Sequence, residues 1–348
     1  METLWYLLIA VMLAVYVVLD GFDFGAGILH LFVAKTDDER RTVLAAIGPF
    51  WDGNEVWLLA AGGTIVFAFP HAYASGFSGF YLPLMMVLWL LVGRGLSIEF
   101  RSKEKNVLWR SFWDGVFFVA STLMAIVLGA ALGNLIRGVP IDSTGYFAGP
   151  LFTNFQPGAH SGVLDWFTVL VGVLTLLILA EHGALYLAFK TTGDVNKRCK
   201  AIARGLWPAL IVVGLLATVA VAKVQPMIVD NVLHRPWIWP LVAVVFAGVV
   251  AVMVLHTKGK ELGAFLASSV TIAIMLASAV LGAYPYILIS TLNPAWSLTV
   301  HNSAAGASTL KIGLFWWPLA LAIAIFYFAT LFRSFKGKVD AATDQYGH

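Results

Sequence analysis

The chain has 348 residues, of which 60% are hydrophobic and 12% are charged, whereas soluble domains average about half apolar and about a quarter charged residues. The mean hydropathy of +0.85 excludes a soluble globular domain, and the composition also excludes disordered, coiled-coil and collagen-like chains. The single cysteine, Cys199, excludes a disulfide-stapled fold. A net charge of +3 is too small to indicate binding to nucleic acid. A polytopic membrane protein remains.

The apolar stretches predict an all-α integral membrane protein. A helix that crosses a hydrocarbon core of about 30 Å needs about 20 apolar residues. Such stretches lie at residues 4–33, 51–69, 77–98, 112–135, 164–188, 206–222, 237–255, 263–284 and 312–332, which predicts nine transmembrane helices. The first stretch has no basic segment before it and no cleavage pattern after it, so we expect a retained helix and not a signal peptide.

The distribution of lysine and arginine between the loops predicts the orientation. Basic residues concentrate in segments 35–43, 99–111, 189–205 and 258–260 and in the tail after residue 332. The loops on the other side carry only Arg137, Lys223, Arg235 and Lys311. Because cytoplasmic loops are enriched in basic residues, we expect the N-terminus outside and the C-terminus in the cytoplasm.

A weak internal repeat suggests that the chain contains two related units. The first span ends with the acids Asp20 and Asp23, and the fifth ends with Glu181 and His182; each is followed by a basic loop. This pattern predicts two similar four-helix bundles, at residues 1–135 and 164–284, joined by an outer loop at 136–163. Residues 285–348 would then supply another outer loop, a peripheral ninth helix and a cytoplasmic tail. The alternative is that basic loops resemble one another by composition alone.

Ionisable residues inside the predicted spans are the strongest functional signal, because each costs at least about 2.5–3.5 kcal/mol at mid-bilayer. They gather toward the cytoplasmic ends of the helices: Asp20, Asp23, Asp52, Glu55, Arg94 and Asp114. The pairs Asp20/Asp23 and Asp52/Glu55 are each spaced i, i+3, so each pair should share one helix face. Some of these acids must bind protons or pair with Arg94, because they cannot all stay charged in a low dielectric. This predicts a proton path from the cytoplasm.

Structural roles are the main alternative for several of these residues. Asp52 and Glu55 lie in the first turn of a predicted helix, where acids cap amide groups and complement the helix dipole. Capping alone is the simpler interpretation of Asp114, two residues into its predicted span, and Arg94 could be a snorkelling anchor at the interface. Capping does not explain the two acids of the first span, because the dipole disfavours negative charge near the C-terminal end of a helix.

No cofactor site is predicted within this chain. Only His182, and His30 near a span end, lie at membrane depth. A bis-histidine haem between them is conceivable, but nothing in the spacing supports it. The sequence also has no metal-binding pattern, no phosphate-binding loop and no cysteine pair.

Five short motifs resemble subunit II of the cytochrome bd-type quinol oxidases. They are LDGFDFGAG at residues 19–27, GPFWDGNEVW at 48–57, SGFY at 78–81, FRSK at 100–103 and WRSFWD at 109–114. Their order and predicted topology agree with that family throughout the first half of the chain, and the second half resembles it in helix pattern only. Cyanide-insensitive relatives share these motifs, so the haem set of the complex stays open.

The resemblance implies a heterodimer in the plasma (inner) membrane of a bacterium or archaeon. A partner, subunit I, would hold haem b and haem d, oxidise quinol and reduce oxygen to water, with charge separation across the membrane. Subunit II would ligate no haem and would supply cytoplasmic protons, with Asp52 as the gate and Lys103 as a weaker member of the path. Trp57, with Trp51 near it, would lie at the subunit boundary or along an oxygen route. Small single-helix accessory subunits are a further expectation.

Two other functions stay open from the sequence. The chain could be a self-contained proton- or ion-coupled transporter built from two repeats, although such carriers bind substrate near the midplane and the acids here lie off-centre. It could also be a scaffold that only stabilises the haem-bearing subunit. Neutralising the acids would then cause haem loss and not slow turnover.

Overall fold

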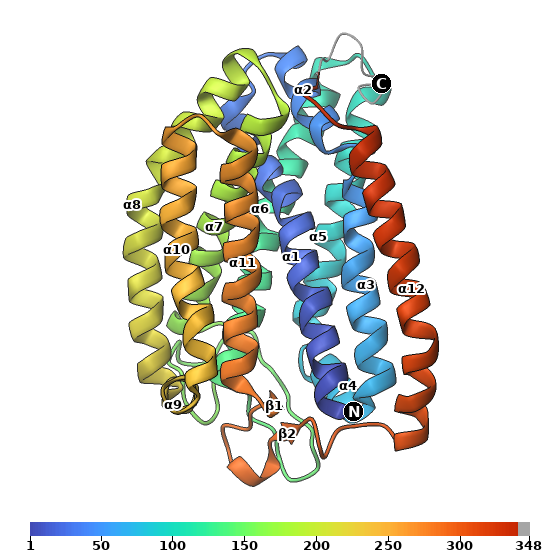
Figure 1. Ribbon diagram of the computed structural model, residues 1–348, viewed down its shortest axis with the longest axis vertical. Coiled ribbons are helices and arrows are strands. Elements are labelled where there is room, and N and C mark those ends of the chain that lie inside the picture. Colours follow the sequence, from blue (N-terminus) through green and yellow to red (C-terminus); the bar gives the residue numbers. More distant parts are fainter. Residues whose placement is uncertain (340–348) are drawn as a thin grey trace.

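The computed structural model describes residues 1–339, which form long helices that run side by side (Figure 1). The helices are α1 (Glu2–Val33), α2 (Asp37–Ile47), α3 (Trp51–Ala68), α4 (Pro70–Gly79), α5 (Tyr81–Phe100), α6 (Val107–Arg137), α7 (Trp166–Lys190), α8 (Gly193–Val224), α9 (Pro226–His234), α10 (Trp239–Thr257), α11 (Glu261–Ala283) and α12 (Ala307–Ser334). Short 3-10 turns, η1 (Arg101–Lys103), η2 (Pro236–Ile238) and η3 (Pro294–Trp296), and two antiparallel strands, β1 (Tyr286–Leu288) and β2 (Leu298–Thr299), complete the described chain.

Eight helices within residues 1–339 are long and apolar enough to cross a membrane: α1, α5, α6, α7, α8, α10, α11 and α12. The all-α membrane architecture predicted from the composition is therefore confirmed. The helix predicted at 51–69 is present as the 18-residue α3. It is not among the eight because Asp52, Asn54 and Glu55 lower the hydropathy of its first turns.

Several boundaries differ from the predictions. The basic segment 35–43, predicted as a loop, is mostly α2, which begins with a capping box in which Thr36 and Glu39 bond each other's backbone amides. Much of the basic segment 189–205 belongs to α8, which begins at Gly193. The third predicted span is interrupted at Phe80, where α4 ends and α5 begins. The hydrophobic pattern identified the membrane core of each helix but not its extension beyond that core.

The two ends of the molecule differ in structure (Figure 1). One end, here called the α2 end, carries α2 and the end of α12. The opposite end carries the N-terminus, α4, α9 and the two strands. The links at that opposite end are hydrogen-bonded; for example, Asp165 caps α7, and Val139 bonds Ile289.

The contact between α1 and α7 lies at the centre of the helix array. A Cβ atom on Gly25 of α1 would lie 2.2 Å from the carbonyl oxygen of Leu179 and 2.5 Å from Cα of Gly183, both in α7. The two backbones can therefore touch only because both helices carry glycine at this position. Close backbone approach at small residues is a main source of helix association in membranes, where lipid supplies no hydrophobic driving force between helices.

We predict that Gly25→Ala destabilises the protein. The added methyl group would overlap α7 backbone atoms, and overpacking of this kind typically costs about 1–3 kcal/mol. Thermal unfolding of the purified protein should show a clearly lower midpoint. The matched control is Gly214→Ala in α8, where an added Cβ meets no atom within 4 Å. An unchanged midpoint for Gly25→Ala would contradict the close packing of α1 and α7.

Candidate functional site

A buried polar cluster joins α1, α3 and α5 and is here called the Arg94 cluster; it comprises Asp20, Asp23, Asn54, Glu55 and Arg94. The Nη1 atom of Arg94 donates to Oδ1 of Asp20 at 2.6 Å, and its Nη2 atom donates to Oε1 of Glu55. The Nδ2 atom of Asn54 donates to Oδ2 of Asp23 at 2.8 Å. Asp20, Asp23, Asn54 and Arg94 are each 0% exposed. Residues that are far apart in sequence therefore share one buried polar site.

Arg94 lies in the interior of the protein and does not reach the interface. Its guanidinium lies 4.2 Å from the ring centre of Phe24 in α1 and pairs with two carboxyl groups. The snorkelling interpretation is therefore wrong for this residue. Capping is also wrong for Glu55, because its carboxyl group is turned toward Arg94. Fully buried guanidinium groups persist when carboxylates compensate their charge.

The Arg94 cluster contains more acids than bases. Asp20, Asp23 and Glu55 face one guanidinium, and the only side-chain hydrogen bond to Asp23 within residues 1–339 comes from an amide, that of Asn54. Three ionised carboxylates beside a single cation are costly in a low dielectric. Proton binding relieves this excess of negative charge. The arrangement is therefore chemically suited to taking up and releasing protons.

Several buried polar atoms around the cluster have unused hydrogen-bonding capacity. Within residues 1–339, no partner reaches Oδ1 of Asp23, Oδ1 of Asn54, Nε of Arg94 or Nε1 of Trp57. Buried polar atoms in proteins are ordinarily bonded to protein groups or to ordered water. These four atoms are exceptions to that rule, and they gather around the Arg94 cluster.

Asp52 lies apart from the other acids. Its side chain is exposed, and no ion pair or side-chain hydrogen bond within the described part of the chain reaches it. The prediction that Asp52 and Glu55 share a face is wrong, because Glu55 turns inward to Arg94. Asp52 begins a stripe of exposed residues on α3, here called the α3 stripe, which continues through Val56, Leu59, Gly63 and Val66. The spacing of these residues follows one side of a helix.

A second buried cluster surrounds Asp114. This carboxyl group, 1% exposed, accepts from Nε2 of His30 at 2.6 Å, from Nη1 of Arg40 at 2.8 Å and from Nε of Arg101 at 2.6 Å. Arg101 also pairs with Asp37 at 2.7 Å. These contacts connect α1, α2, η1 and α6 at the α2 end. Asp114 is therefore a fully paired structural anchor.

The capping interpretation of Asp114 is wrong because α6 begins at Val107 and Asn106 caps it. The apolar run begins later than the helix, so the sequence placed Asp114 too close to the helix start. The basic partners Arg40 and Arg101 were not predicted as site residues. The sequence feature that could have indicated them is their position beside spans that carry buried acids. Lys103 lies at the surface in η1, outside both clusters.

The two predicted tryptophans contact different helices. Trp57 is 9% exposed and packs against Phe328 of α12, with ring centres 5.8 Å apart, so little of its surface is left for a partner chain. Trp51 is half-buried against Gly95 of α5, where an added Cβ would lie 3.4 Å from its ring.

The membrane-depth histidines make polar contacts within the protein. Nε2 of His30 bonds Asp114, and the two ring nitrogens of His182 contact Ser268 and the carbonyl oxygen of Val18, each at 3.0 Å. A bis-histidine haem would need one free nitrogen from each ring aimed at a common iron. The contacts of His182 are incompatible with that arrangement.

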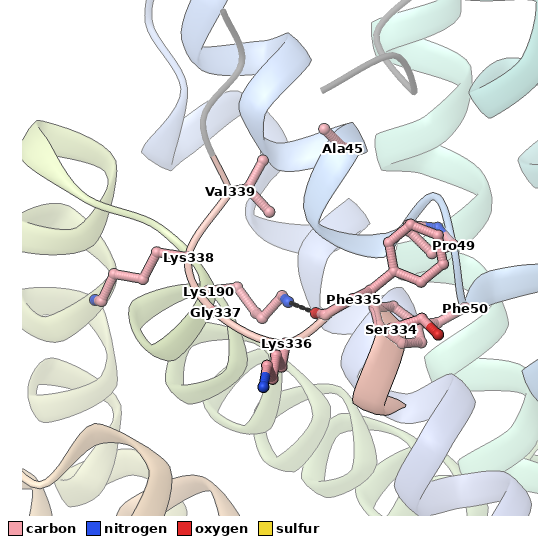
Figure 2. Close-up of a pocket in the computed structure, with 10 residues that line it drawn as sticks. All are labelled: Ala45, Pro49, Phe50, Lys190, Ser334, Phe335, Lys336, Gly337, Lys338 and Val339. Atoms are coloured by element: carbon pink, nitrogen blue, oxygen red, sulfur yellow. Dashed lines mark hydrogen bonds between the residues drawn. The ribbon is translucent and has the colours of Figure 1, made fainter. Parts of the chain in front are cut away.

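Two cavities lie near the helix ends. At the α2 end, a cavity of about 130 Å³ lies between the α2–α3 link and the segment after α12, and Figure 2 shows the hydrogen bond from Lys190 to the carbonyl oxygen of Phe335 beside it. A cavity of about 260 Å³ near the other end is lined mainly by apolar side chains of α1, α4, α6 and α11. Neither cavity is lined by the acids of the Arg94 cluster.

Comparison with known proteins identifies the family. The profile described as "Cytochrome bd terminal oxidase subunit II" matches residues 1–335. The chain is 33% identical to "Cytochrome bd ubiquinol oxidase subunit 2" of Bacillus subtilis (strain 168), over 90% of this chain and 89% of that protein. It is 29% identical to "Cytochrome bd-I ubiquinol oxidase subunit 2" of Escherichia coli (strain K12), over 97% of this chain and 94% of that protein.

A solved structure shares the fold. A chain of the bd oxidase from Geobacillus thermodenitrificans superposes with a TM-score of 0.74 at 19% identity, covering 96% of this chain and 99% of that one. The motifs in α1 and α3, the arrangement of the helices and these matches agree along nearly the whole length. The chain belongs to the cytochrome bd terminal oxidase subunit II family.

Proposed function

We propose that this chain conducts protons from the cytoplasm to the oxygen-reducing centre of a bd-type quinol oxidase. The complex would oxidise quinol and reduce oxygen to water, and the partner, subunit I, would hold haem b and haem d. The family and the relatives, which are named ubiquinol oxidase subunits, support the reaction. The observation that carries the proton role is the Arg94 cluster, with three buried carboxyl groups around one guanidinium.

The α3 stripe supports a position for the partner. A charged side chain that faces lipid costs at least about 2.5–3.5 kcal/mol on insertion scales, so the exposed Asp52 needs a protein or water neighbour. Val56, Leu59 and Val66 on the same stripe are 54%, 73% and 44% exposed. An added Cβ on Gly63 would meet no atom within 4 Å, which leaves room for another helix. Subunit I would cover this stripe.

With subunit I on the α3 stripe, the acids would act one after another in proton transfer. Asp52 would exchange protons at the subunit boundary, and Glu55, one helical turn further along α3, would connect it to Arg94 and Asp20. Asp23 would store a proton, because its only side-chain partner in residues 1–339 is the amide of Asn54. Lys103 and Asp114 are weaker candidates, since one is exposed outside the cluster and the other is closed within ion pairs.

The proposal includes the topology. With its polar first turns covered by the partner, α3 would be the ninth crossing. One four-helix unit would comprise α1, α3, α5 and α6, and the other α7, α8, α10 and α11, with α12 peripheral. The basic segments of the α2 end support a cytoplasmic location for that end in the plasma membrane. Protons would then enter near the start of α3. The position of the acids toward one end, together with the family, disfavours a self-contained transporter.

We predict that Asp52→Asn lowers quinol-oxidase turnover by about tenfold or more, equivalent to at least about 1.4 kcal/mol in barrier. The amide cannot exchange the proton that the carboxyl group carries. The visible haem spectrum should be unchanged, because the proposal gives Asp52 no part in holding a haem. Oxygen consumption by the purified complex, measured across roughly pH 6–8, provides the test.

The control for this variant is Asp38→Asn, which changes an exposed acid of α2. We expect it to turn over at the wild-type rate. Wild-type turnover of Asp52→Asn at every pH would refute its role as the gate. Loss of haem from that variant would instead support a scaffold role.

We predict that Arg94→Met prevents stable assembly, because it leaves buried carboxyl groups without their cation. Removing one partner of a buried ion pair typically costs about 3–5 kcal/mol. The double variant Arg94→Met/Asp20→Asn should recover part of the loss, because it also removes one of the unpaired acids. The yield and thermal-unfolding midpoint of the purified complex measure both effects. Equal stability of Arg94→Met and the wild type would show that Arg94 is not a required charge partner.

A further inference from the structure

A second group of buried polar residues lies between α7 and α11, and the proposed proton path does not use it. It comprises Glu181, His182 and Ser268, which are 6%, 0% and 4% exposed, and is here called the Glu181 triad. No ion pair within residues 1–339 includes Glu181 or His182. A carboxyl group buried without a cation at membrane depth is costly when charged, so its protonation state needs an explanation.

The contacts of the triad form a chain. Nε2 of His182 lies 3.0 Å from the carbonyl oxygen of Val18 in α1, and its Nδ1 lies 3.0 Å from Oγ of Ser268. Oγ of Ser268 lies 3.4 Å from Oε2 of Glu181. The indole of Trp207 in α8 lies close to the same carboxyl group without completing a hydrogen bond. Ser268 is therefore placed between the acid and the imidazole.

Counting the hydrogen atoms along this row of contacts shows which atom carries each of them when the imidazole is neutral. A carbonyl oxygen only accepts, so Nε2 of His182 must carry a hydrogen and donate it to Val18. A neutral imidazole then has no hydrogen on Nδ1, which must accept the hydroxyl hydrogen of Ser268. With that hydrogen used, the remaining contact of Oγ is with Glu181. As long as the imidazole stays neutral, this contact is a hydrogen bond only when the carboxyl group is protonated and donates its own hydrogen to Oγ.

A charged arrangement of the same atoms is also possible. The O–H bond of Glu181 breaks as a new O–H bond forms on Ser268, while the original Ser268 hydrogen moves to Nδ1 of His182. The product is a carboxylate and an imidazolium, with the same number of hydrogens and no change in total charge. The surroundings favour the neutral form: His182 stacks on Phe265 with ring centres 5.0 Å apart and lies 6.4 Å from the ring centre of Phe22. Separated charges are costly in such an apolar setting.

We propose that the Glu181 triad is a proton-binding site in which Glu181 carries the proton at rest and can pass it to His182 through the hydroxyl group of Ser268. The site is separate from the Arg94 cluster, because His182 contacts α1 at Val18 and the position of Gly21 and bonds none of the residues of that cluster. The ligand is a single proton. Its occupancy is independent of whether Asp52 serves as a gate.

Infrared difference spectroscopy of the intact complex tests the resting state. The wild-type spectrum minus that of Glu181→Gln should contain the C=O stretch of a protonated carboxylic acid, and this band should shift in heavy water. Glutamine keeps a donor toward Ser268, so the variant should fold. A difference that contains carboxylate bands and no acid band would overturn the proposal.

A surface acid provides the control for this measurement. Hydrogen bonds from the Thr144 side chain and backbone hold the pKa of Asp142 below its usual value, so this half-buried loop residue is ionised near neutral pH. The wild-type spectrum minus that of Asp142→Asn should therefore contain carboxylate bands only. This comparison shows that the spectrometer distinguishes the two forms in the same complex.

Ser268→Ala tests the relay itself. The variant removes the hydroxyl group that links the acid to the imidazole, so the acid band should remain but shift in frequency as Glu181 loses its acceptor. The shift should be absent from a Ser269→Ala control, because the hydroxyl group of Ser269 bonds the carbonyl oxygen of Phe265 and not the triad. An acid band that is identical in the wild type and Ser268→Ala would overturn the relay.

Discussion

The ion pairs of Arg94 determine how the first helices meet. A guanidinium with no exposed surface needs carboxylate partners, and here it takes one from α1 and one from α3. Three helices that are not consecutive in sequence are thereby connected at one point. Because only one cation serves three carboxyl groups, the same contact that holds the helices together also leaves a capacity for protons. Structural support and the proposed proton chemistry thus involve one set of residues.

The protein buries its polar groups in three different ways. Asp114 is closed among His30, Arg40 and Arg101, so its charge is compensated and its position is fixed. The Arg94 cluster is only partly compensated, and several of its polar atoms keep unused hydrogen-bonding capacity. The Glu181 triad has no ionic partner within the described chain. A fully paired charge is held in place, whereas proton exchange needs groups that are incompletely paired.

The sequence predicted the membrane class, the positions of the long helices and the presence of buried acids, because these depend on composition and on local hydrophobic length. It could not predict which way each acid turns. Asp52 and Glu55 are one helical turn apart, yet Asp52 faces outward and Glu55 faces inward. Glu55 is turned inward because it pairs with Arg94 of α5. Asp114 was placed at a helix start because Arg110 and Ser111 interrupt the apolar pattern of α6, which begins earlier, at Val107. The orientation of the acids depends on tertiary partners that are distant in sequence.

The segment after α12 closes the α2 end of the molecule. The backbone amide of Val339 bonds the carbonyl oxygen of Lys190, the Nζ atom of Lys338 bonds Glu261, and Phe335 packs near Phe50 just before α3. Ribosomal synthesis makes these residues after the twelve α-helices of the described part of the chain. The contacts by which this segment joins α7, α11 and the α2–α3 link can therefore form only after α12 has been synthesised, whereas the direct bond from Tyr186 of α7 to Ala46 of α2 can form earlier.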